Sequence, residues 1–386
     1  MQAVAALLSC RGHVRILLDY RPALRVRSGV GEYVHELARA LATLGGEAAG
    51  DDVVLFSSSW KDRLDPHVLP GCSVVDRRIP VRCLNFAWHR LEWPPAEHLA
   101  GPGLDVVHSL HPLLLPARRA ARVVTVHDLD FLAHPERTRA EIRRDYPALA
   151  GAHVRRADHV IVNSRFTAAE VTRTLGVPPA RVTVCSPGAP DWRPNDPRTP
   201  GGYVLFIGTL EPRKNLPTLL DAWAMLVSRR PDLPELVLAG QPTPEATPWL
   251  ARLEREPLAG RARAIGYVPP ERRRAVFEGA AALVVPSYHE GFGIPALEAM
   301  TMGVPVVAAN RGALPEVVGD AGLLVDPHDA AQLADALERV LTDGSLAVAL
   351  GERGRARAAR YTWRAAATAA RQAYASAVDE RSRRHG

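Results

Sequence analysis

The stretch Val14-Arg15-Ile16-Leu17-Leu18 opens the pattern that decides the fold, because this short apolar run is followed by a helical pattern. Apolar residues recur at positions 30, 34, 37, 41 and 44, and the pair Gly45-Gly46 is expected to end this helix. A strand followed by an amphipathic helix is the repeating unit of a parallel sheet with crossover helices. The beginning of the chain therefore predicts an α/β fold.

The same alternation runs through most of the chain. In the first half, strands are expected at residues 14–18, 53–56, 105–108, 123–126, 160–162 and 182–185. The alternation restarts in the second half, with strands expected at residues 203–207, 235–239, 282–285, 305–308 and 323–325. Residues 187–202 are rich in proline and glycine, which is linker composition. The sequence therefore predicts two tandem Rossmann-like α/β domains.

Size and composition fit two soluble domains. The chain has 386 residues, of which 47% are hydrophobic and 23% are charged. No apolar run approaches the roughly 20 residues that cross a bilayer, so a cytoplasmic location is expected. The net charge of +6 would suit nucleic acid, an anionic membrane or an acidic substrate. An excess of this size also serves solubility alone, and no nucleic-acid partner is expected.

Ligands of open α/β sheets bind at the carboxyl ends of the strands, so each loop after a strand is a candidate site. The expected strand at 203–207 is followed by Gly208-Thr209-Leu210-Glu211-Pro212-Arg213-Lys214-Asn215. Arginine offers a planar fork to oxygen atoms and lysine a compact charge, so Arg213 and Lys214 together could neutralise a diphosphate. The alternative is an ordinary solvated start of a helix.

A second loop follows the expected strand at 282–285. It carries two carboxylates, Glu290 and Glu298, and the glycines Gly291 and Gly293 allow a ligand to approach the backbone closely. Pro295 in a first helical turn would direct free backbone N–H groups at an anion. From the residues alone, the two carboxylates are an acid/base pair, acceptors for sugar hydroxyls or part of a solvated face.

Two loops of the first half are further candidates. Val126-His127-Asp128-Leu129-Asp130 places a histidine and two aspartates at the end of a strand, which favours a polar active-site edge over a metal-binding pair or a structural histidine. Ser28-Gly29-Val30-Gly31-Glu32-Tyr33 places glycines between the first strand and the first helix. It lacks the nicotinamide-binding spacing, and it suits either the approach of a phosphate or substrate or an ordinary loop.

Together these segments resemble glycosyltransferase family 4, the retaining transferases of the GT-B fold, along nearly the whole chain. The resemblance rests most specifically on Gly208, Pro212-Arg213-Lys214-Asn215, Glu290, Glu298 and Gly303-Val304-Pro305-Val306-Val307-Ala308. Ala313-Leu314-Pro315-Glu316-Val317 and Gly322-Leu323-Leu324-Val325-Asp326-Pro327 continue it. It implies an acceptor-side Rossmann-like domain at 1–195, a nucleotide-sugar domain at 196–360 facing it across a cleft, and a helix at 361–386 that packs back toward the N-terminal domain.

The resemblance also implies roles for individual residues. Arg213 and Lys214 match the pair that holds the donor diphosphate, Glu298 matches the carboxylate that binds the ribose, and Glu290 matches the one that contacts the transferred sugar. The catalytic set is His127, Glu290, Arg213 and Lys214. The donor-binding set adds Gly208, Thr209, Tyr267, Val268, Gly291, Phe292, Gly293, Ile294, Leu297 and Glu298. The acceptor side is expected at Gly29, Gly31, Tyr33, His127 and Asp128.

Asp19-Tyr20-Arg21-Pro22 and the His127 segment look like the bacterial mannosyltransferase branch, which implies GDP-mannose as the donor. The expected reaction moves a hexose to an acceptor hydroxyl with retention, in the synthesis of a glycan, polysaccharide, glycolipid or glycoside. No metal or other cofactor is expected, because Arg213 and Lys214 stabilise the leaving group. The alternatives are a nucleotide-sugar epimerase of similar fold and a non-catalytic sugar-nucleotide-binding protein.

A run of arginines follows the His127 segment. It indicates either peripheral contact with the inner face of an anionic membrane or a solvated basic helix. The run comprises Arg137, Arg139, Arg143, Arg144, Arg155 and Arg156. Residues 1–12 precede the first expected strand and are either a short arm or a misassigned start.

Overall fold

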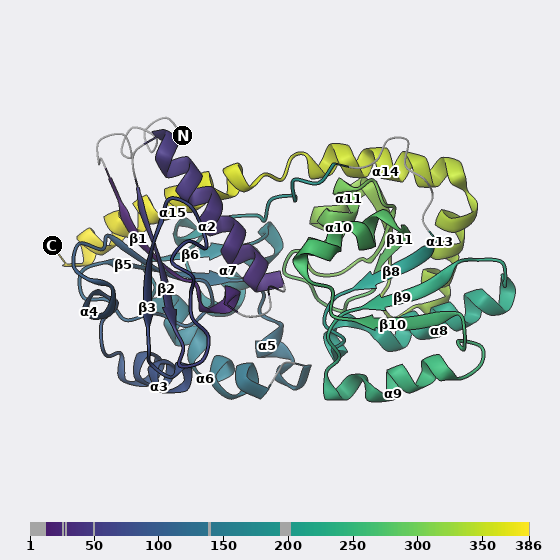
Figure 1. Cartoon of the computed structure of the whole chain (residues 1–386), viewed down its shortest axis with the longest axis horizontal. Helices are drawn as coiled ribbons and strands as arrows, with labels where there is room; N and C mark the ends of the chain where they lie inside the picture. Colours follow the sequence, from purple (N-terminus) through teal and green to yellow (C-terminus); the bar gives the residue numbers. More distant parts are fainter. Residues whose placement is uncertain are drawn as a thin grey trace. The chain divides into compact units, whose positions relative to one another are not determined.

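The computed structural model describes residues 13–24, 27, 29–48, 51–137, 140–193 and 202–385, and Figure 1 shows its helices and strands. The chain forms two compact units. The first contains the residues up to Gly188 and the C-terminal segment from Thr362, and the second consists mainly of Ala189–Tyr361. The expected arm at 1–12, Ser28 and the expected boundary at 195/196 lie outside the described residues.

The first unit is built on a seven-stranded sheet whose strand pairs are all parallel. In chain order the strands are β1 (Arg15–Asp19), β2 (Asp52–Ser58), β3 (Cys72–Arg77), β4 (Val106–Ser109), β5 (Ala121–Val126), β6 (His159–Val162) and β7 (Val182–Val184). Its helices are α2 (Gly29–Ala48), α3 (Val81–Phe86), η2 (Ala87–Leu91), α4 (Ala96–Ala100), α5 (Asp130–Ala133), α6 (Ala140–Arg156), α7 (Arg165–Leu175) and α15 (Trp363–His385).

The second unit is built on a six-stranded sheet, again parallel throughout. Its strands are β8 (Tyr203–Ile207), β9 (Glu235–Ala239), β10 (Ala262–Gly266), β11 (Ala280–Val285), β12 (Val306–Ala309) and β13 (Gly322–Val325). Its helices are η5 (Pro212–Lys214), α8 (Leu216–Arg229), α9 (Thr247–Leu250), α10 (Pro270–Glu278), α11 (Ile294–Thr301), α12 (Leu314–Val318), α13 (Ala330–Thr342) and α14 (Gly344–Ala358).

The order of the strands identifies where each sheet can bind a ligand. It is β3-β2-β1-β4-β5-β6-β7 in the first sheet and β10-β9-β8-β11-β12-β13 in the second. The chain therefore builds each sheet outward in one direction and then in the other, and the reversal lies between β1 and β4 and between β8 and β11. Loops diverge at such a point and leave a crevice at the carboxyl ends of the strands.

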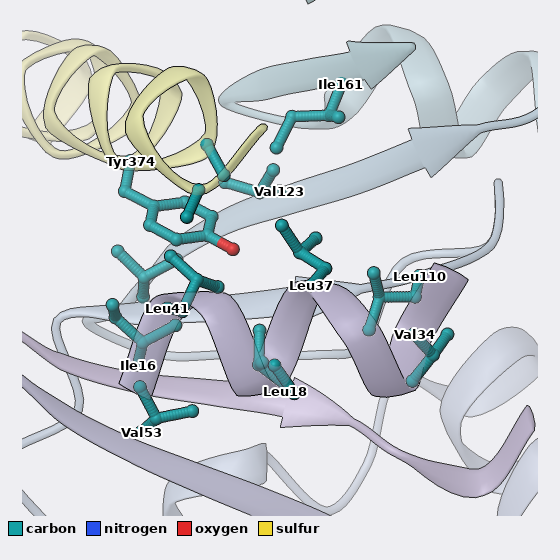
Figure 2. Close-up of a cluster of buried hydrophobic side chains, with 14 of the residues drawn as sticks. Ile16, Leu18, Val34, Leu37, Leu41, Val53, Leu110, Val123, Ile161 and Tyr374 are labelled. Carbon is teal, nitrogen blue, oxygen red and sulfur yellow. The ribbon is translucent and has the colours of Figure 1, made fainter. Parts of the chain in front are cut away.

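The C-terminal helix completes the core of the first unit. Figure 2 shows Tyr374 of α15 beside Leu37 and Leu41 of α2, above Ile16 and Val53 of the sheet. Inside this core the His108 Nδ1 and the Tyr374 hydroxyl are 2.8 Å apart, so a hydrogen bond joins α15 to β4. A line of small residues on α15 lets the helix approach closely, namely Ala366, Ala367, Ala370, Ala373 and Ala377.

The predicted fold class is confirmed, and two of its details are wrong. Strands β3 and β10 are absent from the prediction; both are edge strands, and their partly exposed side chains do not form an apolar run. The pair Gly45-Gly46 does not end the first helix, because α2 continues to Ala48. Glycine costs a helix only about 1 kcal/mol relative to alanine, which neighbouring residues can offset.

Candidate functional site

Two cations and a buried carboxylate meet at the reversal point of the second sheet. Arg213 and Lys214 lie in η5, just after β8, while Glu290 lies in the loop between β11 and α11. Lys214 Nζ is 2.6 Å from Glu290 Oε1, and Arg213 Nη1 is 3.3 Å from Glu290 Oε2. Arg213 also donates to the His289 carbonyl and to Glu211. The residues that the sequence singled out in two separate loops are therefore in direct contact.

Glu290 is held in its ionised form. Its residue is 7% exposed, and burial alone would raise the pKa of its carboxyl group. The charges of Lys214 and Arg213, with hydrogen bonds from Lys214 and Ser287, outweigh burial and lower this pKa to about 2. A carboxylate ionised at neutral pH accepts hydrogen bonds and cannot act as a general acid.

Asn215 fixes the loop after β8 against its neighbours. Its backbone is left-handed, with φ of 56°, and its side chain is fully buried. Asn215 Nδ2 donates to the carbonyl of Pro286 at 3.0 Å and to that of Pro327 at 2.7 Å. One side chain thus joins the loops that follow β8, β11 and β13, and it holds the cations in place for Glu290.

Gly312 supports Glu290 from the loop after β12. Its φ is +61°, and a Cβ atom there would lie 2.6 Å from the backbone oxygen of Glu290. The neighbouring Ala313 N–H donates to the same oxygen at 2.9 Å. Only glycine accommodates both this conformation and this approach. The sequence alone gave Gly312 no role, although it directly precedes the Ala313–Val317 segment quoted above.

Glu298 lies in α11 and is paired with Arg273 of α10. Arg273 Nε donates to Glu298 Oε1 at 3.0 Å, and its Nη2 contacts Oε2, so the arginine holds both carboxylate oxygens. Glu298 is 4% exposed. A two-point grip of this kind fixes the plane of the carboxylate. Sequence reasoning missed Arg273, whose only signal is the run Arg272-Arg273-Arg274 ahead of the expected strand at 282–285.

The other expected donor residues follow β8, β10 or β11, or lie in α11. Gly208 and Thr209 follow β8, Tyr267 and Val268 follow β10, and Gly293 precedes α11, which begins at Ile294 with a proline in its first turn. Gly291, Phe292 and Gly293 are buried. The side chains of Phe292 and Leu297 belong to the hydrophobic core, which leaves the backbone of this loop, rather than these side chains, available to a ligand.

His127 directly follows β5, at the carboxyl end of a strand of the first unit's sheet. Its Nε2 is 3.0 Å from the Leu110 carbonyl and its Nδ1 is 3.0 Å from the Asn163 side-chain nitrogen. Burial lowers the pKa of His127, so the ring is neutral at neutral pH. A neutral ring that donates through Nε2 and accepts through Nδ1 satisfies both contacts. Both ring nitrogens are therefore occupied by the protein itself.

The other residues expected on the acceptor side lie in α2 and beside His127. The Tyr33 ring meets the His127 ring edge to face, with centroids 5.2 Å apart, and Tyr33 is 1% exposed. Gly29 and Gly31 belong to the first turn of α2. The expectation that they lie in a loop between the first strand and the first helix is therefore wrong. Asp128 is half-buried, and its Oδ1 accepts the backbone N–H of Asp130.

The expectations about the arginine run, membrane-spanning helices and metal sites can be compared only with the described residues. The side chains of Arg137, Arg139, Arg143 and Arg144 lie outside it, whereas Arg156 forms an ion pair with Glu92. Within the described ranges, no helix is long and apolar enough to cross a membrane. Among the same residues, no three His, Cys, Asp or Glu side chains are grouped so that they could hold a metal ion.

Comparison of the sequence with known proteins identifies its family. Residues 27–193 match the model described as Glycosyltransferase Family 4, and residues 191–357 match that described as Glycosyl transferases group 1. O-antigen chain mannosyltransferase B of Escherichia coli is 34% identical over 272 residues, which cover 67% of this chain and 71% of the relative. D-inositol 3-phosphate glycosyltransferase of Corynebacterium diphtheriae is 33% identical, over 91% of this chain and 90% of the relative.

A solved structure agrees with the fold. Sucrose-phosphate synthase from Thermosynechococcus elongatus has a TM-score of 0.75 and 26% identity, over 94% of this chain and 98% of that chain. Both family models together span most of the two units, and the relative from Corynebacterium diphtheriae aligns over 91% of the chain. The chain therefore belongs to glycosyltransferase family 4 and is a glycosyltransferase of GT-B fold, with two Rossmann-like α/β domains.

Proposed function

We propose that this enzyme moves mannose from GDP-mannose to an acceptor hydroxyl, with retention at the anomeric carbon and without a divalent metal. Use of a nucleotide sugar follows from the family. The observation that carries the site assignment is the contact of Arg213 and Lys214 with Glu290 at the reversal point of the second sheet. The mannosyltransferase of Escherichia coli among the relatives supports mannose.

Arg213 and Lys214 would stabilise the departing diphosphate. Lys214 uses one of its three N–H donors on Glu290, which leaves it able to donate to phosphate oxygens as well. The negative charge on the leaving group grows as the sugar bond breaks, so fixed cations stabilise the transition state more than the ground state. In other transferases a bound metal ion supplies this positive charge, whereas here the two side chains would supply it.

Glu290 would orient the transferred sugar. Its carboxylate is ionised and pinned by Lys214 and Ser287, so it accepts hydrogen bonds from sugar hydroxyls in a fixed direction. Glu298, held in plane by Arg273, would bind the ribose hydroxyls of the nucleotide. His127 would mark the acceptor side, and its occupied nitrogens favour a positioning role over proton transfer.

The decisive assay offers a panel of nucleoside diphosphate sugars, with and without mannoside acceptors, in the presence of a chelator. We expect GDP release that requires GDP-mannose and an acceptor and that survives the chelator. Release with another sugar nucleotide would refute the donor, and loss of activity in the chelator would refute metal independence. Conversion of the sugar without an acceptor would instead indicate an epimerase.

Peripheral contact with a membrane is part of the same proposal. Three large apolar side chains of the first unit lie exposed within eight residues: Phe86 is 60%, Leu91 62% and Trp93 62% exposed. Aromatic and aliphatic side chains that flank cations are typical of segments that lie in a bilayer interface, and Arg82 and Arg90 are exposed in the same segment. Co-sedimentation with anionic vesicles tests this, with Trp93→Ser as the variant expected to reduce it.

A further inference from the structure

Three histidine rings gather at the reversal point of the first sheet. Asp19 ends β1 and His111 follows β4, the two strands between which the order of the sheet reverses. His89 of η2 lies with its ring centroid 5.7 Å from that of His111 and 6.3 Å from that of His153, in α6. We call His89, His111 and His153 the imidazole cluster. It occupies the place at which open α/β sheets bind ligands.

The charges beside the imidazole cluster cancel each other. Arg21 Nε and Nη2 donate to the two oxygens of Asp19 at 2.7 and 2.6 Å, and His111 Nε2 is 3.2 Å from Asp19 Oδ2. Arg21 Nη1 donates to Asn85, and its guanidinium lies 4.9 Å from the Trp88 ring centroid. Asp19 is fully buried and remains ionised, since its neighbours hold its pKa far below the ordinary value. All three nitrogens of the Arg21 guanidinium therefore donate to protein groups.

His89 and His153 are neutral. Burial lowers the pKa of His89 to about 3 and also lowers that of His153. His153 Nδ1 accepts the backbone N–H of Leu114 at 3.0 Å, so the proton of this neutral ring is on Nε2. His111 likewise accepts the Leu113 N–H through Nδ1 and donates to Asp19 through Nε2. His89 and His153 therefore offer uncharged hydrogen-bonding groups.

One of these groups lacks a partner. His89 is 8% exposed, and its Nε2 is buried with no hydrogen bond to any of the described residues. An unsatisfied buried nitrogen is costly, and a ligand hydroxyl that both donates and accepts removes that cost. The cluster is also close to His127, because the Leu110 carbonyl that contacts His127 belongs to the residue before His111.

We infer that the imidazole cluster is the subsite for an uncharged acceptor, a glycan end recognised through its hydroxyls by His89 and His153, and not for a phosphorylated acceptor. The inference rests on the proposed function, because it names the acceptor class of the same enzyme. Phosphate groups are bound by free cations or unpaired backbone N–H groups. Arg21 beside the cluster is ion-paired with the buried Asp19, so these two charges cancel.

Equilibrium binding tests this without requiring turnover. The probes are α-1,3-mannobiose, which is neutral, and mannose 6-phosphate, titrated into the full chain and followed by ligand-detected NMR. His153→Asn keeps an acceptor at the position of Nδ1, for Leu114, and removes the Nε2 donor, whereas His153→Gln retains a donor near Nε2. The matched control is His67→Asn, an exposed histidine of the same unit.

We expect mannobiose to bind the unmodified chain and the His67→Asn variant equally. His153→Asn should weaken binding about tenfold, the scale of one lost hydrogen bond, and His153→Gln should restore most of it. His89→Leu should also weaken binding, with the midpoint of thermal unfolding reporting whether each variant is folded. A chain that fails to bind mannobiose, that binds mannose 6-phosphate more tightly, or that is indifferent to His153→Asn overturns the inference.

The outcomes separate this inference from the proposed function. Normal mannobiose binding that responds to His153→Asn, together with no transfer from GDP-mannose, leaves the subsite standing and refutes the donor. Transfer from GDP-mannose to phosphorylated sugars in preference to neutral ones confirms the donor and refutes the subsite. Neither result depends on interpreting the other.

Discussion

Lys214 Nζ lies 2.6 Å from Glu290 Oε1, so a residue after β8 and a residue after β11 form one charged unit. The pair joins the two loops that diverge at the reversal point of the second sheet. Substitutions on one side are therefore expected to affect the other, and a double substitution should cost less than the sum of the two single ones.

Lys214→Ala should lower transfer by about 10²–10³-fold, because it removes charge that stabilises the leaving diphosphate. The fold should persist, since Arg213 still contacts Glu290. The steady-state rate at saturating donor measures the effect, and Lys61→Ala, an exposed lysine of the first unit, is the control. A Lys214→Ala enzyme that turns over at the unmodified rate would contradict the phosphate assignment.

Glu298→Ala and Glu290→Gln should have different effects. The first removes a proposed ribose contact that lasts throughout the reaction, so the affinity for GDP alone should fall. The second misplaces the sugar, so turnover should fall while GDP affinity stays. Calorimetric titration with GDP distinguishes the two variants, and the roles are reversed if Glu290→Gln is the one that loses GDP.

The ion pairs of Glu290 give a pH signature. Its pKa in the folded chain, about 2, lies below the ordinary value of 4.5, so the pairs contribute stability that is fully present above about pH 4.5. This contribution declines as the pH falls from 4.5 and is lost near pH 2. The difference in free energy of unfolding between the unmodified chain and Glu290→Gln should therefore shrink only across this acidic range. A change between about pH 6 and pH 8 would have another origin.

Gly312→Ala should harm catalysis without touching a charged group. Its Cβ would meet the backbone of Glu290 at 2.6 Å, in a conformation with φ of +61° that alanine rarely adopts. We expect a lower rate at saturating donor, because the carboxylate is displaced, together with reduced thermal stability. Gly344→Ala is the matched control, since a Cβ there meets nothing within 4 Å. Equal rates for the two variants would show that Gly312 does not position Glu290.

The sequence predicted the sheets and the charged loops because both leave local signals. Buried central strands such as β8 and β11 are continuous apolar runs, and Arg213, Lys214 and Glu290 stand directly after them. The edge strands β3 and β10 carry no such run. Arg273 was out of reach for another reason: its partner Glu298 lies on a different helix, and only the packing of α10 beside α11 brings the two together. The imidazole cluster could not be predicted from the sequence either, because its three histidines come from separate segments.

The hydrophobic core of the first unit has a consequence for how the protein is made. Its residues on α2 and on the sheet leave the ribosome early, whereas Tyr374 and the alanines of α15 leave it only after residues 189–361. The nascent first unit therefore carries an uncovered apolar surface throughout the synthesis of residues 189–361, which can fold in the meantime because their core needs nothing from α15. A stalled or prematurely ended chain exposes that surface permanently, which makes it a substrate for chaperones and proteases even when its second unit is fully folded.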